Sequence, residues 1–238
     1  MQVIFRQTPK LNGGDHFGSR IAFREDKTLF VALGDRRNRP LVQQGDNHVG
    51  KVIRINRDGS LPLDNPGISG FRPDVWSFGH RNPQGAAIRP GSGALWISEH
   101  GPRGGDEINK VEAGGNYGWP TVSYGCEYGD PADEGCEIGG GQHQPEFVEP
   151  ITYWEPLSIA TSGMMFYEGA AFPSWSGDIF VGALADRSVW RLELEGEQVV
   201  ARERLFSDLG ERIRDIAEGP DGLIYFLTDS GNLWRIAP

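Results

Sequence analysis

The sequence is poor in cysteine and lysine and has no long apolar run. No stretch approaches the roughly 18 consecutive apolar residues of a membrane-spanning helix. Its two cysteines form no CxxC pair, and two thiols alone do not make a zinc site. Acidic residues outnumber basic ones, 33 to 23, and the formal net charge is −10. This balance argues against a nucleic-acid-binding protein, because such proteins present a net basic surface.

The N-terminal residues, MQVIFRQTPKLNGG, do not resemble a signal peptide. They lack an apolar stretch of about 7–15 residues and a cleavage site of small residues. The two cysteines, Cys126 and Cys136, lie in the acidic, glycine-rich segment YGCEYGDPADEGCEIGGG. A local disulfide that closes this loop and a pair of free thiols are both compatible with the sequence.

Glycine and proline are abundant. The chain has 34 Gly and 16 Pro in 238 residues, and they separate short β-rich runs instead of gathering in one tract. Helical periodicity is nearly absent. This pattern indicates many turns between many short strands, and therefore an all-β fold.

Four segments share one pattern: a short apolar strand, a turn, a second apolar strand and a polar end. They are 19–35, 85–101, 162–186 and 213–236, with the second strands aligned at Leu29, Leu95, Ile179 and Ile224. Repetition favours a β-propeller over a β-sandwich, which needs no repeat. We expect one domain over 1–238, with further strands at 51–56 and 233–237. Long polar loops over 35–50, 57–75, 101–125 and 125–150 should gather at the mouth of the channel, where ligands bind.

Two polar motifs suggest catalytic or binding groups. GGDHFGSR (13–20) places Asp15 beside His16, a natural general base near neutral pH that an adjoining carboxylate can orient. GHRNPQG (79–85) offers donors from Arg81 and Asn82 at the start of a strand. The alternatives are a histidine bonded to loop backbone and a turn that caps itself.

A third motif is rich in oxygen ligands. EHGPRGGDEIN (99–109) and GGNYGWP (114–120) leave carbonyls free of strand pairing, and Asp106 and Glu107 add carboxylates. Ca²⁺ accepts such hard ligands, although the spacing does not match an EF-hand.

A fourth motif, ERIRD (211–215), alternates two arginines. In a strand, Arg212 and Arg214 point to the same face. Their charges repel unless they share an anion or an acid such as Glu211 or Asp215 intervenes. A surface ladder of ion pairs is the alternative.

The order of GDHFGSR, GHRNPQG, EHGPRGGDEIN, GGNYGWP and RIRD resembles the soluble aldose dehydrogenases of the glucose/sorbosone dehydrogenase family. These are six-bladed propellers that use pyrroloquinoline quinone (PQQ) and Ca²⁺. The resemblance covers essentially the whole chain and about four blades. It implies a periplasmic protein in which family sequence preceding Met1, about a third of the usual length, is missing.

The resemblance also implies roles for individual residues. His16 matches the base that takes the proton of the sugar C1 hydroxyl, and Asp15 matches its acidic neighbour. Arg81 matches a catalytic residue that touches the reactive carbonyl of the cofactor. Residues expected to contact PQQ are His16, Arg81, Asn82, Tyr128, Ala183, Leu184, Arg212 and Arg214. The carbonyls of Gly101 and Pro102 match ligands of the Ca²⁺ that clamps PQQ, and Glu107 and Tyr117 resemble ligands of a second, structural Ca²⁺.

One position departs from the family. The family has a cofactor-binding Lys where this chain has Ala185, and Arg187 is the nearest cation that could replace it. In the segment 154–163, we expect Ser158 to line the substrate side.

The activity that the resemblance implies is oxidation of an aldose at C1 to its lactone. Electrons would pass to a dye or to a respiratory quinone or cytochrome. Two alternatives are a non-catalytic calcium-binding propeller and a calcium-dependent propeller lactonase.

Overall fold

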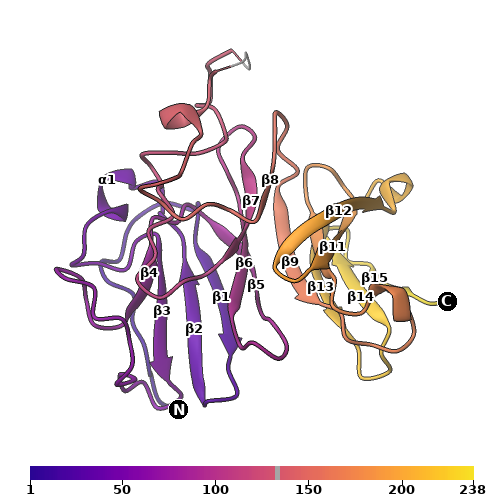
Figure 1. Cartoon of the computed structure of the whole chain (residues 1–238), viewed down its shortest axis with the longest axis horizontal. Coiled ribbons are helices and arrows are strands. Elements are labelled where there is room, and N and C mark those ends of the chain that lie inside the picture. Colours follow the sequence, from indigo (N-terminus) through magenta and orange to yellow (C-terminus); the bar gives the residue numbers. More distant parts are fainter. Residues whose placement is uncertain (132–134) are drawn as a thin grey trace.

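The computed structural model describes residues 1–131 and 135–238, and its regular secondary structure consists mainly of antiparallel sheets (Figure 1). The first sheet contains β1 (Gly18–Phe23), β2 (Thr28–Leu33), β3 (Lys51–Asn56) and β4 (Val75–Phe78). The second contains β5 (Pro83–Ile88), β6 (Leu95–Glu99), β7 (Asp106–Lys110) and β8 (Thr152–Trp154).

The third sheet contains β9 (Thr161–Phe166), β10 (Ile179–Ala183), β11 (Val189–Glu195) and β12 (Gln198–Leu205). The fourth contains β13 (Ile213–Glu218), β14 (Ile224–Thr228) and β15 (Leu233–Ile236). Helical segments in the described part are short: α1 (Arg39–Val42) and the 3-10 turns η1 (Ile138–Gly140), η2 (Pro173–Trp175) and η3 (Ser207–Leu209). None of them has the length and apolar character of a membrane span.

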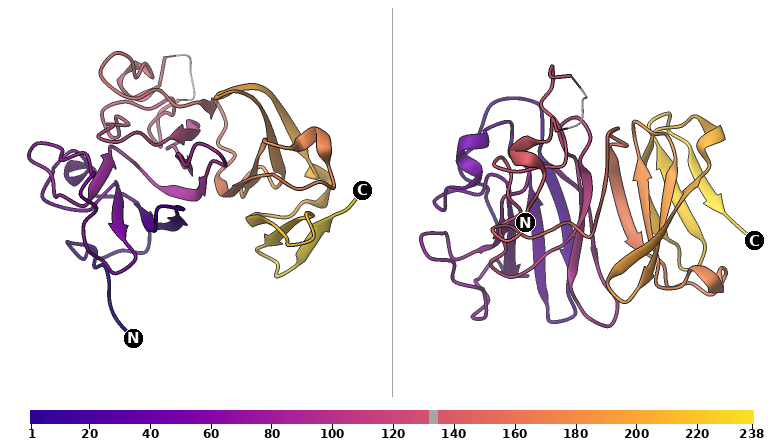
Figure 2. Two further views of the ribbon diagram at one scale, coloured as in Figure 1. Left: turned by 60° about the horizontal axis from the view of Figure 1, so that its bottom comes forward. Right: turned by 45° about the horizontal axis from the view of Figure 1, so that its top comes forward.

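The four sheets follow one another along an arc, each with its first strand on the inside (Figure 2). β1 packs against β5, β5 against β9, and β9 against β13. An ion pair of 3.2 Å between Arg20 of β1 and Asp215 of β13 joins the innermost strands of the first and last sheets. The arrangement is consistent with a propeller-like fold.

Apolar side chains fill the spaces between successive sheets. Trp96 and Ile108 of the second sheet pack with Met164 and Val181 of the third. Similar clusters lie between the first and second sheets and between the third and fourth. The central strand β3 is covered on both faces. Its first five residues are therefore all buried, and buried residues do not alternate with exposed ones.

The all-β prediction is confirmed. All four aligned second strands form, as β2, β6, β10 and β14, and the predicted strands at 51–56 and 233–237 correspond to β3 and β15. Two predicted loops are wrong in part, because α1 lies within 35–50 and β7 within 101–125. The sequence of β7, DEINK, carries no apolar alternation, yet four of its five residues are buried.

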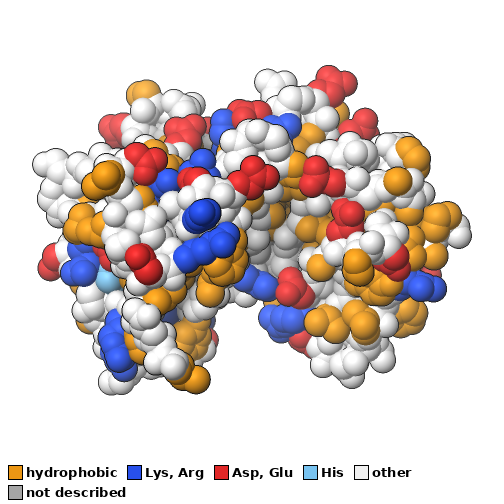
Figure 3. Space-filling model, turned by 90° about the horizontal axis from the view of Figure 1, so that it is seen from below, with side chains coloured by type: hydrophobic (Ala, Val, Ile, Leu, Met, Phe, Trp, Pro, Cys, Tyr) orange, Lys and Arg blue, Asp and Glu red, His pale blue; other side chains and the backbone are white. Residues whose placement is uncertain are grey.

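Some large apolar side chains remain exposed. The space-filling view shows apolar patches on both halves of the molecule, on either side of a hollow (Figure 3). In the fourth sheet Leu227, Leu233 and Trp234 are exposed, and in the first sheet Ile21 and Phe23 are exposed.

Candidate active site

His16 is held by a carboxylate from another part of the chain. Its Nδ1 lies 2.6 Å from Oδ1 of Asp35, which follows β2. The side chain of Asp35 is 1% exposed and that of His16 is 12% exposed. Burial alone would raise the pKa of Asp35, but hydrogen bonds from His16, Arg37 and Trp119 hold it below its usual value. An ionised Asp35 keeps the proton of His16 on Nδ1 and leaves Nε2 as an acceptor.

The prediction that Asp15 orients His16 is wrong. The Asp15 carboxylate instead pairs with Arg37 Nε at 2.8 Å, and both side chains are more than half exposed. His16 adopts a left-handed backbone with φ of 49°. Adjacent side chains in such a bend point apart, so the neighbour in sequence is not the neighbour in space.

A pocket of about 350 Å³ opens beside His16. Its walls combine predicted residues with others that the sequence reasoning did not select: His16, Asp35, Arg37, Arg39, Pro40, Arg81, Trp119 and Tyr128. Arg81 is buried, and its Nη1 donates to the carbonyl of His100 at 3.0 Å. Its Nε has no hydrogen-bond partner within the described part of the chain. A buried donor without an acceptor is costly, so this edge of Arg81 is suited to a ligand oxygen.

Glu99 fixes the turn that carries Arg81 and Asn82. Its Oε2 accepts the backbone N–H groups of these two residues at 2.9 and 3.2 Å. Asn82 itself is buried, and its Oδ1 accepts from Gln84 at 2.9 Å. Burial raises the pKa of Glu99 to about 7.

A second, inner cavity of about 10 Å³ lies behind Arg81 and is lined by Glu99, Gly101, Glu107 and Tyr117, among others. Glu99 of β6 and Glu107 of β7 are directly opposite each other. Burial and the charge of Glu99 raise the pKa of Glu107 well above its usual value. Asn109 donates to both carboxylates, at 3.1 and 2.8 Å, and its own Oδ1 has no partner among the described residues. The cavity has room for one ion or water, and its two facing acids need either a proton or a cation between them.

Tyr117 lines this cavity, but its hydroxyl is engaged in hydrogen bonds to other groups. The hydroxyl donates to the Lys110 carbonyl at 2.5 Å and accepts the Glu112 N–H at 2.8 Å. Any ligand atom from Tyr117 would therefore be its main-chain carbonyl, which accepts no backbone hydrogen bond from the described residues.

The turn at Gly101 brings main-chain oxygens together. A Cβ at Gly101 would lie 2.3 Å from the carbonyl oxygens of both Gly104 and Gly105. The Pro102 carbonyl accepts from the hydroxyls of Tyr128 and Ser158, at 3.1 and 3.2 Å. In the described residues, no cluster of three or more His, Cys, Asp or Glu side chains could hold a metal. A cation here would depend mainly on carbonyls.

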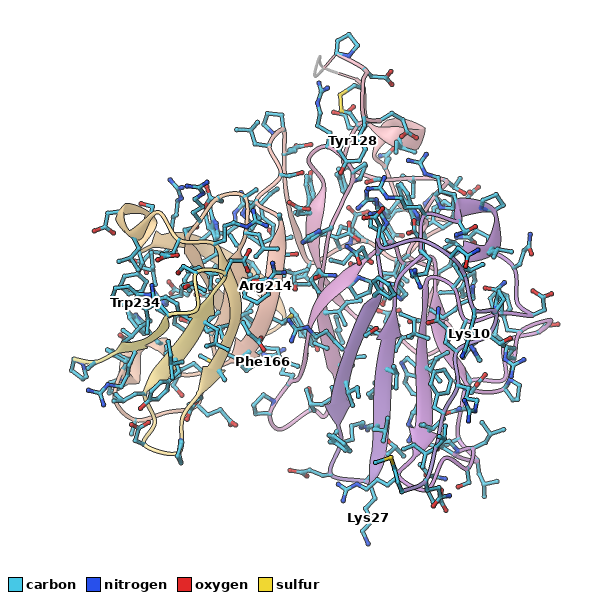
Figure 4. All side chains as sticks on the ribbon, turned by 180° about the vertical axis from the view of Figure 1, so that it is seen from behind. Lys10, Lys27, Tyr128, Phe166, Arg214 and Trp234 are labelled. Carbon is cyan, nitrogen blue, oxygen red and sulfur yellow. A yellow bond between two sulfur atoms is a disulfide. The ribbon has the colours of Figure 1, made fainter. Side chains whose placement is uncertain are left out.

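Tyr128 lies in a loop that projects past the strand ends (Figure 4). Cys126 and Cys136 form a disulfide in this loop, which decides between the two readings of the sequence. Glu127 pairs with both terminal nitrogens of Arg39, so the loop is tied to α1 as well as to Pro102.

Arg212 and Arg214 share one acid, which is Asp229 and neither of the nearby examples, Glu211 and Asp215. All three side chains are partly exposed, so the arrangement corresponds to the surface ladder of ion pairs that the sequence left open. Asp229 accepts Arg212 Nε at 2.8 Å and Arg214 Nε and Nη2 at 2.8 and 3.0 Å. Arg214 lies on the side of the last sheet that faces the first two (Figure 4).

The Ala183–Leu184 segment reaches one of these arginines, because the Leu184 carbonyl accepts Arg212 Nη1 at 3.0 Å. Arg187 does not join them. Its Nη1 contacts the Gly210 carbonyl at 3.4 Å, and the side chain is exposed.

His100 lies between Arg81 and the third sheet, and the sequence motifs did not identify it as a site residue. Its Nε2 lies 2.5 Å from the Thr161 carbonyl of the third sheet. Burial lowers its pKa to about 4, and the charges of Arg81, His16 and Arg214 add to the effect. His100 is therefore neutral and lies among three of the predicted site residues. Its position before Gly101, at the end of an apolar strand, was the available signal.

The profile of the family described as Glucose / Sorbosone dehydrogenase matches residues 1–235. The chain belongs to the glucose/sorbosone dehydrogenase family. The resemblance seen in the sequence motifs is thereby confirmed.

Individual relatives agree with this membership. The aldose sugar dehydrogenase YliI of Escherichia coli (strain K12) is 46% identical over 244 residues, covering 100% of this chain and 64% of YliI. A solved structure described as glucose dehydrogenase superposes with a TM-score of 0.90 at 48% identity, covering 100% of this chain and 68% of its own. The PQQ-bound aldose sugar dehydrogenase of Streptomyces coelicolor gives a TM-score of 0.73 at 28% identity, covering 94% and 62%. The chain thus spans somewhat less than two thirds of the length of YliI.

Proposed function

We propose that the protein oxidises the C1 hydroxyl of an aldose to the corresponding lactone, with PQQ as hydride acceptor and Ca²⁺ as Lewis acid. The observation that carries the proposal is the pocket of about 350 Å³ whose wall holds both the His16–Asp35 pair and Arg81. Family membership and the named activities of the relatives support it.

His16 is the proton acceptor in this proposal. Oxidation of the C1 hydroxyl removes a hydride from carbon and a proton from oxygen. The Nε2 lone pair of His16 takes the proton, and Asp35, 2.6 Å from Nδ1, stabilises the imidazolium that forms. Burial of Asp35 strengthens this interaction because water does not screen it.

The residues present fit PQQ. When bound, PQQ supplies a two-electron acceptor for the hydride and Ca²⁺ polarises it. The unpartnered Nε of Arg81 offers a donor to a quinone oxygen. Arg212 and Arg214, prearranged on Asp229, suit the carboxylates of PQQ. Asn82, Tyr128, Ala183 and Leu184 complete the proposed contacts.

The residues also fit Ca²⁺. The carbonyl of Gly101, and that of Pro102 once it exchanges its hydrogen bonds from Tyr128 and Ser158, would hold the ion next to the cofactor, in a turn already dense in main-chain oxygens. The inner cavity suits a second ion held by Glu107 and the Tyr117 carbonyl, because a cation could replace the proton that the two facing buried acids otherwise hold between them.

The proposal includes the surroundings that the resemblance implies. The four sheets would represent four blades of a six-bladed propeller, the location would be periplasmic, and a dye or respiratory acceptor would take the electrons. The Cys126–Cys136 disulfide is compatible with an oxidising compartment.

The test is sugar-dependent dye reduction by purified protein supplied with PQQ and Ca²⁺. His16→Ala should reduce the rate by about 10²–10⁴-fold, the usual contribution of a general base. His48→Ala is the matched control, because His48 is likewise paired with a carboxylate but contacts Thr8 and Asp74 away from the pocket. An inactive wild-type protein, or equal rates in wild type and His16→Ala, would refute the proposal for this chain.

Two alternatives make different predictions in the same assay. A non-catalytic calcium-binding propeller would show a higher melting temperature with Ca²⁺ but no effect of PQQ. A lactonase would hydrolyse lactones without added quinone. The carbonyl-rich turn at Gly101 argues against the lactonase, since a lactonase needs side-chain carboxylates converging on one metal.

A further inference from the structure

We propose that Trp119 is a positioning residue that locks Asp35 against His16 and supports Arg81 on the same indole ring. The proposal rests on the proposed function for the role of His16 as proton acceptor. Trp119 belongs to the GGNYGWP motif, to which the sequence reasoning assigned only oxygen ligands.

The indole N–H determines where the Asp35 carboxylate can point. Trp119 Nε1 donates to Asp35 Oδ2 at 2.8 Å, while Oδ1 receives His16 Nδ1 at 2.6 Å and the Arg37 N–H at 2.8 Å. With donors on both oxygens, the carboxylate cannot rotate about its Cβ–Cγ bond without losing one of them. Asp35 is almost fully buried, so no water would replace a lost donor.

Trp119 is itself rigidly held. The residue is 4% exposed. Its main-chain N–H donates to the Gly79 carbonyl at 3.0 Å, and its main-chain carbonyl accepts Gln43 Nε2 at 2.7 Å. Gly79 precedes the turn that carries Arg81, and Gln43 ends α1. One residue of the long loop between β7 and β8 is thereby fixed to both neighbouring parts of the pocket wall.

The ring face supports the cationic side of the pocket. The guanidinium carbon of Arg81 lies 5.2 Å from the ring centroid of Trp119, and that of Arg39 lies 4.6 Å from it. Within the described chain the guanidinium of Arg81 has only the His100 carbonyl as a hydrogen-bond acceptor, and the Trp119 ring lies closer to it than the ring of Tyr128, which is 6.0 Å away. The N–H edge of Trp119 thus holds Asp35, the partner of His16, and the ring face of Trp119 supports Arg81.

The test uses the substitution Trp119→Phe, which removes the indole N–H and keeps an aromatic face. The matched control is Trp154→Phe. Trp154 is 5% exposed, and its Nε1 has no hydrogen-bond partner in the described residues, so the same change there removes no hydrogen bond.

The readout is the low-field proton NMR signal of His16 Nδ1–H, recorded without cofactor or substrate and assigned by its loss in Asp35→Asn. We expect wild type and Trp154→Phe to show it. In Trp119→Phe it should exchange with water about tenfold faster, the effect expected when a hydrogen bond to a charged group is lost. An unchanged signal in Trp119→Phe, or no such signal in wild type, would overturn the proposal.

A second variant covers the case in which Trp119→Phe does not fold. Benzothienylalanine at position 119 replaces the indole N–H by sulfur and preserves ring size, and it should show the same faster exchange. Where turnover is measurable, Trp119→Phe should lower kcat about tenfold and leave the KM for sugar within about twofold, because substrate contacts remain. Absence of turnover in wild type would count against the proposed function alone, since the NMR result does not depend on it.

Discussion

His16 and Asp35 are separated by 19 positions in the chain and joined by a hydrogen bond of 2.6 Å. The bond links the loop before β1 to the turn after β2, two strands that pair along most of their length. The antiparallel pairing brings the start of one strand next to the end of the other. The geometry of the proposed base is therefore a product of the first sheet.

Asp35→Asn should reduce dye-linked turnover by about 10²–10⁴-fold, whereas Asp15→Asn should cost less than about tenfold. An Asn amide can donate to Nδ1 and move the imidazole proton to Nε2, which then cannot accept the substrate proton. Asp15 is exposed and bonded to Arg37, so its loss leaves the His16 hydrogen bond intact. Steady-state rates of dye reduction by the two variants measure this difference. Equal losses would show that Asp15 shares the orienting role.

Asp229→Asn should weaken PQQ binding by about tenfold, because one charge-assisted acceptor organises Arg212 and Arg214 together. Tryptophan fluorescence quenching by PQQ measures the dissociation constant. Asp221→Asn is the control, since Asp221 is an exposed carboxylate of the same sheet that bonds to Tyr225. Tighter binding in Asp229→Asn would mean that Asp229 competes with the cofactor for the arginines.

The stability contribution of Lys51 should depend on pH. Its ammonium is fully buried and donates to the carbonyls of Val42 and Val49, both at 2.8 Å. Burial lowers its pKa from 10.5 to about 7, although Asp46 partly opposes the shift. Between these values the unfolded chain binds one more proton than the folded one, so this group favours folding increasingly as pH rises.

Urea unfolding of wild type and Lys51→Met at pH 7, 8 and 9 tests this expectation. The difference in the free energy of unfolding should move in favour of wild type by up to about 1.4 kcal/mol per pH unit. A difference that does not change with pH would contradict the assignment.

Reduction of the Cys126–Cys136 disulfide should lower the free energy of unfolding by about 2–3 kcal/mol, the loop-closure effect for a separation of 10 residues. Urea titrations with and without dithiothreitol measure it, and the Cys126→Ser/Cys136→Ser variant should match the reduced protein. Because the loop carries Tyr128 and Glu127, reduced protein should also bind PQQ more weakly. An unchanged PQQ dissociation constant would show that the disulfide does not support the pocket.

Local patterns predicted the first two strands of each sheet, together with β3 and β15, but not β4, β7, β8, β11 or β12. Apolar runs bounded by Gly, Pro and Asp gave β2, β6, β10 and β14, since a short apolar segment between turns has few other ways to bury itself. Strand β7 was missed because its buried face is made of Asp106, Glu107 and Asn109, whose burial depends on partners from other elements.

The sequence by itself determined the all-β class, the repeated sheets and the family, because turn residues, apolar runs and the order of motifs are properties of the chain read in one direction. Only the tertiary structure decided which charges meet: Asp35 and not Asp15 on His16, Asp229 and not Glu211 or Asp215 between the two arginines, and Glu99 opposite Glu107. Charge pairing depends on distance and burial, which strand pairing sets within one sheet for residues such as Arg214 and Asp229. Trp119 and Asp35, 84 positions apart, become neighbours only when the loop between β7 and β8 packs on the first sheet.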